Sequence, residues 1–146
     1  MAVQTGQAAP DFSLFASDKQ EVTLSEQKGK NIVLLFFPMA FTSVCTAELC
    51  NVRDNYDMYN KLNAQVYGIS VDSPFTLAEF KKQQNLNFPL LSDFNKEASN
   101  AYGAMYETFA MGMKGVSKRA AFVIDTEGVV QYAEVLEDAG NCSCST

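Results

Sequence analysis

One stretch of the sequence constrains the fold most: an apolar run over residues 32–37 is followed at once by Pro38 and then by helical spacing. A uniformly apolar run of this length is typical of a strand buried on both faces. From residue 45, apolar side chains recur every three or four positions, which predicts a half-buried helix reaching about residue 63. The apolar positions are Cys45, Leu49, Val52, Tyr56 and Tyr59. The chain is therefore expected to pack around a buried strand that leads into a helix.

Cys45 lies at the start of this predicted helix, and Thr42 and Ser43 before it are good N-cap residues. A sulfur in the first turn faces backbone N–H groups that have no partner within the helix, and it faces the positive end of the helix dipole. Both features stabilise a thiolate, which is the reactive form of cysteine. We interpret Cys45 as a nucleophile; a lone cysteine on an apolar helix face is otherwise a packing residue.

Length and charge narrow the class of protein. With 146 residues the chain can bury a core of its own, and we predict one domain over residues 1–146, with residues 137–146 as a flexible tail. No apolar run has the length of a membrane span, and no secretory signal begins the chain, so we expect a cytoplasmic protein that does not bind membranes. The net charge of −6 argues against binding to nucleic acid.

The chain contains no histidine, which excludes Ser-His-Asp and Cys-His catalysis and every metal site that needs imidazole. If Cys45 reacts, backbone dipoles, an arginine or a hydroxyl must activate it. The other cysteines are Cys50, Cys142 and Cys144, and their C-x4-C and C-x-C spacings are not those of zinc sites. We therefore expect no metal and no cofactor.

The remaining elements indicate the fold class. Strands are expected at 12–15 and 21–24 as a hairpin, at 65–71, at 88–93, and at 120–124 and 129–135 as a second hairpin; helices are expected at 73–84 and 95–102. Residues 25–30 are expected to form a loop or one helical turn. This order predicts an α/β fold, in which helices flank a central mixed β-sheet that begins with an N-terminal β-hairpin.

Pro38, Thr42 and Cys45 form the pattern P-x-x-x-T-x-x-C at the predicted junction of strand and helix. Together with Glu48, and with Arg119 just before the strand at 120–124, this pattern resembles the active site of peroxiredoxins. The resemblance extends over residues 3–137. The stretches FPMAFTSVC, FPLLSD and AYG resemble the alkyl hydroperoxide reductase E type, whereas C-x4-C resembles the peroxiredoxin Q, or bacterioferritin-comigratory, type.

The resemblance implies a thioredoxin-like fold and a thiol-dependent peroxidase without a metal. Its substrates would be hydrogen peroxide and organic hydroperoxides. Its reductant would be thioredoxin, glutaredoxin or a low-molecular-weight thiol, and it would form a homodimer. The alternatives are a dithiol-disulfide oxidoreductase that uses Cys45 and Cys50, and a redox-sensing binding domain.

The resemblance also suggests roles for the site residues. Arg119 would donate to both sulfur and peroxide through its fork of N–H groups, and Thr42 would donate or accept through its hydroxyl. Pro38 would wall the pocket and limit water around the sulfur. Glu48, one turn beyond Cys45, would hold Arg119 in place.

The product would be a sulfenic acid on Cys45, which a second thiol resolves. Cys50 is the nearest candidate, and it is also readily interpreted as a packing residue. In an intact helix, positions five apart have Cα atoms roughly 8–9 Å apart, whereas a disulfide tolerates about 7 Å at most. The helix would have to unwind for Cys50 to react. Cys142 and Cys144 are expected to lie in a solvated tail without a defined role, and the alternative is a second resolving pair. This tail stops where family members continue into a further helix.

Overall fold

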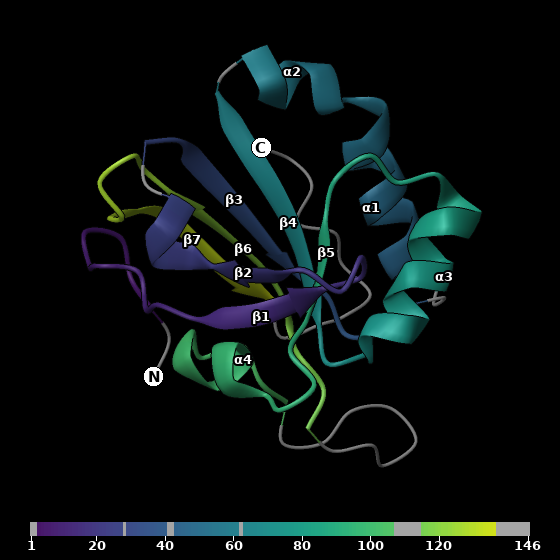
Figure 1. The fold of residues 1–146 in the computed structure, drawn as a ribbon. Helices are drawn as coiled ribbons and strands as arrows, with labels where there is room; N and C mark the ends of the chain where they lie inside the picture. The colour runs from purple at the N-terminus through teal and green to yellow at the C-terminus, as the bar shows by residue number, and fades with distance from the viewer. Residues whose placement is uncertain (1–2, 28, 41–42, 62, 107–114, 137–146) are drawn as a thin grey trace.

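The computed structural model of the protein describes residues 3–27, 29–40, 43–61, 63–106 and 115–136, and for residues 43–48 and 58–60 it describes the backbone alone. Within these residues, seven strands form one mixed sheet with the order β2-β1-β5-β4-β3-β6-β7 (Figure 1). The strands are β1 (Ser13–Ala16), β2 (Glu21–Thr23), β3 (Asn31–Phe36), β4 (Ala64–Ser70), β5 (Leu90–Ser92), β6 (Arg119–Ile124) and β7 (Val130–Leu136). The helices are η1 (Leu24–Gln27, a 3-10 turn), α1 (Ser43–Asp54), α2 (Tyr56–Lys61), α3 (Pro74–Gln84) and α4 (Glu97–Ala101).

The β3 strand lies inside the sheet, where it runs parallel to β4 and antiparallel to β6. Its side chains alternate between two cores, because successive residues of a strand point to opposite faces. Leu34 and Phe36 pack on one face, and Leu35 and Phe37 continue the other. Burying each such side chain stabilises the fold by about 1.5–3 kcal/mol. The prediction of a strand buried on both faces is confirmed.

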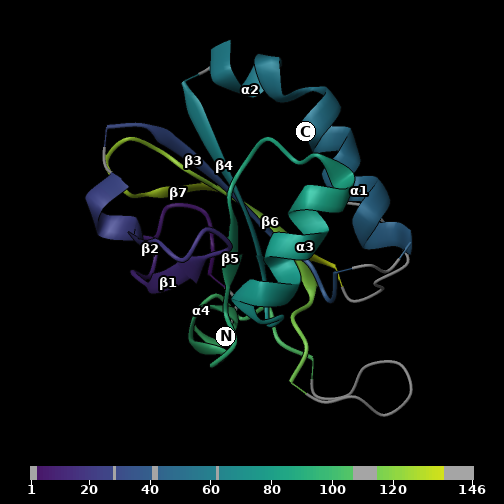
Figure 2. The ribbon, with the colours of Figure 1, turned by 45° about the vertical axis from the view of Figure 1, so that its right-hand side comes forward.

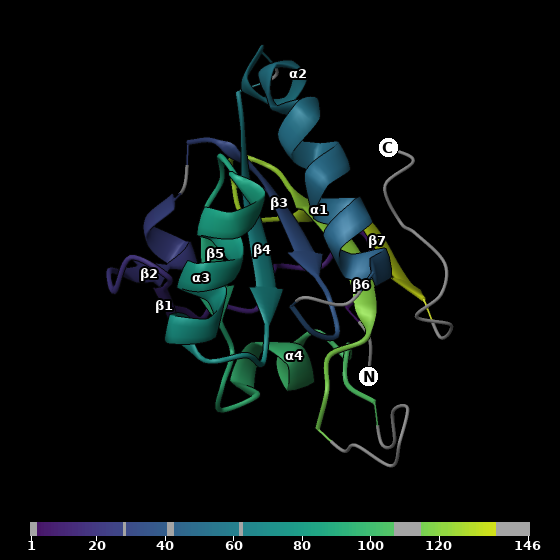
Figure 3. The ribbon, with the colours of Figure 1, turned by 90° about the vertical axis from the view of Figure 1, so that its right-hand side faces the viewer.

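Helices cover both faces of the sheet. Figure 3 looks onto the face covered by α1 and α3, whose Leu49 and Phe80 belong to the same core as Leu35. Tyr102, which ends α4, packs into the other core and lies 5.0 Å from Phe122 between ring centroids. Figure 2 shows α4 at the lower end of the molecule, with α2 at the upper end. The predicted α/β class, with a mixed sheet and an N-terminal β1–β2 hairpin, is confirmed.

The start of α3 follows the sequence signal closely. The Ser73 hydroxyl accepts from the backbone N–H of Thr76 at 3.2 Å, and Pro74 occupies the first helical position, where no N–H is needed. The helix ends at Asn85, which has a left-handed backbone with φ of 52°. The predicted helix at 95–102 is shorter in the structure, where Asp93 accepts from the backbone N–H groups that open α4.

Two local predictions are wrong. The helix expected to run to about residue 63 breaks at Asn55, between α1 and α2. The Asn55 side chain donates to the carbonyl of Asn51 at 2.8 Å, and its backbone N–H is shared between the carbonyls of Asn51 and Val52. An asparagine side chain that bonds nearby backbone in this way competes with helix continuation. The second difference is Arg119, which is the first residue of β6 rather than the residue before it.

None of the described helices combines the length and apolar character needed to cross a membrane. The predicted tail at 137–146 lies outside the described residues, and β7 is the last described element.

Candidate active site

The candidate site lies where β3 leaves the sheet and leads into α1. Phe37 continues the ladder by donating its N–H to the carbonyl of Ile69 at 2.9 Å, and Pro38 follows as a buried residue. The α1 helix begins at Ser43, so the backbone of Cys45 lies in its first turn, as the sequence predicts. The first-turn N–H groups of a helix have no carbonyl partner within it, and they favour an anion nearby.

The turn between β3 and α1 is anchored by Asp72, which sequence reasoning missed. A carboxylate oxygen of Asp72 accepts from the backbone N–H of Ala40 at 2.8 Å and from the Ser70 hydroxyl at 2.7 Å. Ser70 is the last residue of β4, the parallel neighbour of β3. The carboxyl ends of parallel strands share one edge of a sheet, where ligands bind in many α/β folds. The signal that could have found Asp72 in the sequence was therefore its position, just after the second buried strand.

A chain of hydrogen bonds continues from this anchor to the segment that precedes Arg119. The Ser70 carbonyl accepts from the backbone N–H of Asp93, and the buried Asp93 carboxylate accepts from the N–H of Ser99 at 2.6 Å. The hydroxyls of Ser99 and Ser117 lie 2.6 Å apart and are fully buried. Hydrogen bonds thus link Ala40, which follows β3, to Ser117, which lies two residues before Arg119.

Arg119 lies at that same edge and is only 1% exposed. Its neighbour Ala120 pairs with Phe36 across the antiparallel β3–β6 ladder, which places Arg119 beside the end of β3. A permanent positive charge is rarely buried unless polar or anionic partners satisfy it. A buried guanidinium at this edge suits a site that stabilises an anion such as a thiolate.

The structure places some of the predicted site residues and leaves others outside the described residues. It brings Pro38 and Arg119 to one edge of the sheet, and it places the backbones of Cys45 and Glu48 in the first two turns of α1. Thr42 lies outside the described residues. The predicted contact between Glu48 and Arg119 stays a prediction.

Cys50 is a half-buried free thiol on α1, and its Sγ donates to the side-chain oxygen of Gln84 at 3.5 Å. The helix is continuous from residue 43 to residue 54, which keeps the Cα atoms of Cys45 and Cys50 at the roughly 8–9 Å of helical geometry. A disulfide between them cannot form in this conformation. Cys142 and Cys144 lie outside the described residues.

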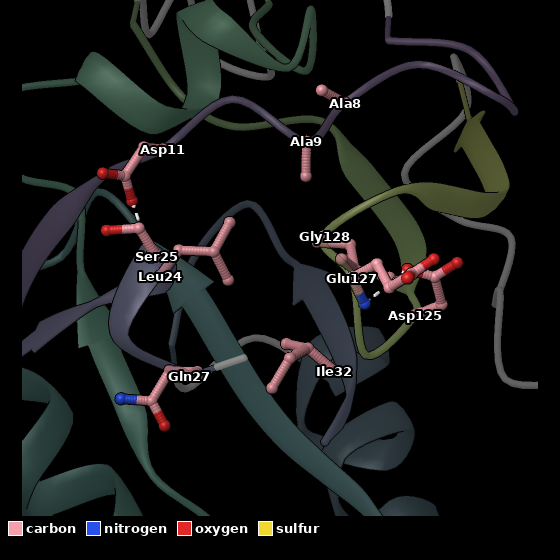
Figure 4. A pocket seen from close by; sticks show the side chains of 11 residues that line it. Ala8, Ala9, Asp11, Leu24, Ser25, Gln27, Ile32, Asp125, Glu127 and Gly128 are labelled. Atoms are coloured by element: carbon pink, nitrogen blue, oxygen red, sulfur yellow. Dashed lines mark hydrogen bonds between the residues drawn. The ribbon is translucent and has the colours of Figure 1, made fainter. Parts of the chain in front are cut away.

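A pocket of about 180 Å³ lies at the opposite edge of the sheet, between the N-terminal segment, η1 and the β6–β7 turn (Figure 4). Its acidic groups shape turns: Asp11 accepts from the backbone N–H of Ser25 at 2.8 Å, and Asp125 accepts from those of Glu127 and Val129. The hydrogen bonds that Asp125 accepts lower its pKa, and the bond from the Val129 N–H is the largest cause. Among the predicted site residues whose side chains the structure describes, none of Pro38, Cys50 and Arg119 lines this pocket.

Comparison with known proteins identifies the family. The sequence profile of the AhpC/TSA family matches residues 5–133. The chain belongs to the AhpC/TSA family. The chain is similar to alkyl hydroperoxide reductase E of Mycobacterium tuberculosis, with 38% identity over 136 residues that cover 91% of this chain and 86% of that protein.

Solved structures with a similar fold support the family assignment. Peroxidoxin BcpB of Mycobacterium tuberculosis is 31% identical, with a TM-score of 0.83 and coverage of 92% of this chain and 87% of that one. A PrxQ variant of Xylella fastidiosa, at 22% identity, supports the fold alone, with a TM-score of 0.87 and coverage of 95% and 89%. The thioredoxin-like peroxiredoxin fold and the family together make the chain a thiol-dependent peroxidase, which uses a hydroperoxide and a thiol reductant.

Proposed function

We propose that Cys45 is the peroxidatic nucleophile, with Arg119, Thr42, Pro38 and Glu48 completing the site. The observation that best supports this proposal is the placement of a buried arginine at the sheet edge where β3 leads into the first turn of α1. Backbone N–H groups of that turn and a guanidinium both favour a thiolate. They supply the activation that a chain without histidine needs.

Thiolate formation accounts for only part of the rate. A cysteine with a pKa near 8.5 is about 3% thiolate at pH 7, and lowering the pKa to roughly 6 gives about 90%, a gain of about thirtyfold. A less basic thiolate is also a poorer nucleophile. The remaining acceleration comes from groups that align the peroxide and stabilise charge on the departing oxygen.

In the proposed reaction, the Cys45 thiolate attacks one peroxide oxygen; an S–O bond forms as the O–O bond breaks. The departing oxygen leaves as water or an alcohol after taking a proton, and Cys45 is oxidised to a sulfenic acid. Arg119 stabilises the negative charge that shifts from sulfur to the leaving oxygen. Thr42 orients the peroxide through its hydroxyl, Pro38 limits water, and Glu48 holds Arg119.

The sulfenic acid is then reduced by a thiol. Cys50 serves as the resolving thiol once the first turns of α1 unwind, and the resulting disulfide is reduced by thioredoxin, glutaredoxin or a low-molecular-weight thiol. Hydrogen peroxide and small organic hydroperoxides are the proposed substrates. The proposed location is the cytoplasm, where such thiol reductants are present and cysteines stay reduced.

We also propose that the chain is one domain that forms a homodimer. Three aromatic side chains of the described residues are unusually exposed: Phe15 at 53%, Phe75 at 71% and Phe94 at 60%. All three line one groove of about 510 Å³ between β1, the start of α3 and the residues after β5. Exposed apolar patches of this kind mark interaction surfaces, whose cores are rich in aromatic residues.

The test of the nucleophile is mass spectrometry after one equivalent of peroxide, with a sulfenic-acid trap present. In a Cys50→Ser variant, we expect the trap to label Cys45. In the parent protein, we expect the peptide that carries both cysteines to lose two hydrogens. A Cys45→Ser variant is the control and should give neither product. Peroxide consumption with Cys45 unmodified would contradict the assignment.

A further inference from the structure

The C-terminal half of α1 is fastened to the end of α3 around Cys50. The Cys50 Sγ donates to the Gln84 side-chain oxygen at 3.5 Å, and the Arg53 guanidinium donates to the Gln84 carbonyl. From the loop that follows, Asn87 donates to the carbonyl of Arg53 at 3.2 Å. Leu49, on the same half of the helix, is fully buried. Cys50 therefore sits in a part of α1 that is hydrogen-bonded to the end of α3 and is anchored in the core by Leu49.

We propose that Gln84 is a positioning residue that holds Cys50 away from Cys45 and so slows the resolving step. The proposal rests on the proposed function, in which Cys50 resolves the Cys45 sulfenic acid. The Cys50–Gln84 hydrogen bond must break before Cys50 can reach Cys45, because Gln84 belongs to α3 and the two cysteines are too far apart in the intact helix. The contact thus sets part of the barrier for the second step and leaves the first step unaffected.

The chemistry of the two groups explains the direction of this effect. An amide oxygen only accepts, so it bonds the Cys50 thiol and repels the thiolate. The Cys50 thiol is therefore held by α3, and it can react with another sulfur only after this contact breaks. The Arg53 guanidinium fastens the same end of α3 by donating to the Gln84 carbonyl.

The resolving step, which Gln84 delays, consumes only the Cys50 thiol and the Cys45 sulfenic acid. The Cys50 sulfur attacks the Cys45 sulfur, an S–S bond forms and the S–O bond of the sulfenic acid breaks. The hydroxide leaves as water with the proton that Cys50 gives up. The Cys45 sulfur is reduced and the Cys50 sulfur is oxidised, with no further reactant.

The test compares Gln84→Ala with Gln83→Ala, a matched control on the same helix whose side chain is exposed and bonds only within α3, to Glu79. Two rates are measured: disulfide formation after one equivalent of peroxide, and iodoacetamide alkylation of Cys50 in a Cys45→Ser background. We expect Gln84→Ala to raise both rates roughly two- to tenfold, the value of one neutral hydrogen bond. Gln83→Ala should leave both within about twofold of the parent.

A Gln84→Glu variant distinguishes this role from general loosening of the helix. A carboxylate keeps the acceptor and nearly the same volume, so it can still bond the Cys50 thiol. We expect both rates in Gln84→Glu to stay at or below those of the parent, whereas general loosening of the helix would raise them as Gln84→Ala does. Rates in Gln84→Glu that match those of Gln84→Ala would overturn the proposal.

The remaining outcomes separate this inference from the function on which it rests. Alkylation and disulfide formation that are equal in the Gln84→Ala and Gln83→Ala variants would overturn the inference while Cys45 still forms a sulfenic acid. Faster alkylation with unchanged disulfide formation would also overturn it, because Gln84 would then not govern resolution. Absence of a sulfenic acid on Cys45 would instead remove the proposed function, and the resolving role of Cys50 with it.

Discussion

The edge of the sheet where β3 and β4 end and the opposite edge, where they begin, carry similar residue types but use them differently. At the edge where β3 and β4 end, the polar groups Ser70, Asp93, Ser99, Ser117 and Arg119 are all at most 1% exposed. At the opposite edge, the carboxylates of Asp11 and Asp125 form turns around the pocket of Figure 4. Burying polar groups costs free energy unless their bonds are satisfied. The buried, hydrogen-bonded edge is the one at which we propose that the reacting groups lie.

The largest expected effect tests the charge at the site edge. Arg119→Lys keeps the positive charge and removes the planar fork, so we expect sulfenic acid formation to slow by about 10²–10³-fold, the scale of losing one well-placed donor to developing charge. Stopped-flow measurement with hydrogen peroxide gives this rate. The same rate in an Asp125→Asn variant, at the other edge, should stay unchanged. Equal rates in the Arg119→Lys variant and the parent would end the assignment of Arg119.

An intermediate effect is expected at Asp72, because two donors depend on its carboxylate. Asp72→Ala leaves the Ala40 N–H and the Ser70 hydroxyl without their acceptor, so the free energy of unfolding should fall by about 1–3 kcal/mol. A displaced β3–α1 turn should also slow peroxide reduction by about tenfold or more. Urea unfolding and stopped-flow kinetics measure the two effects. A loss of stability with full activity would mean that Asp72 supports only the fold.

The smallest effect concerns pH and the opposite edge. Because the pKa of Asp125 is lowered from 3.8 in the folded protein, its contribution to stability is present above pH 3.8 and is lost as pH falls through the folded pKa. The difference in Tm between the parent and Asp125→Asn should therefore shrink below about pH 4. Thermal unfolding across pH 2–7 measures it. A difference that grows on acidification would contradict the assigned hydrogen bonds.

Much of the fold was predictable because its signals are local. The uniform run of β3, the Ser73-Pro74 start of α3 and the β6–β7 hairpin depend on neighbouring residues only, and the structure confirms them. The break at Asn55 was not predicted, since the apolar spacing continues across it and the competing side-chain bond is not visible in the pattern.

The candidate site, like the fold, was predictable from the sequence only in part. The motif around Cys45 is contiguous, so the sequence by itself determined the candidate nucleophile, its place in the first turn of a helix and, through resemblance, the family. Only the tertiary structure decided that Arg119 is buried beside the end of β3 and that Asp72 anchors the intervening turn. It also decided that Gln84 contacts Cys50. These pairings join residues 32 to 84 positions apart, from Ala40 with Asp72 to Phe36 with Ala120. Pairing at such separation depends on strand order and helix packing, which no local pattern specifies.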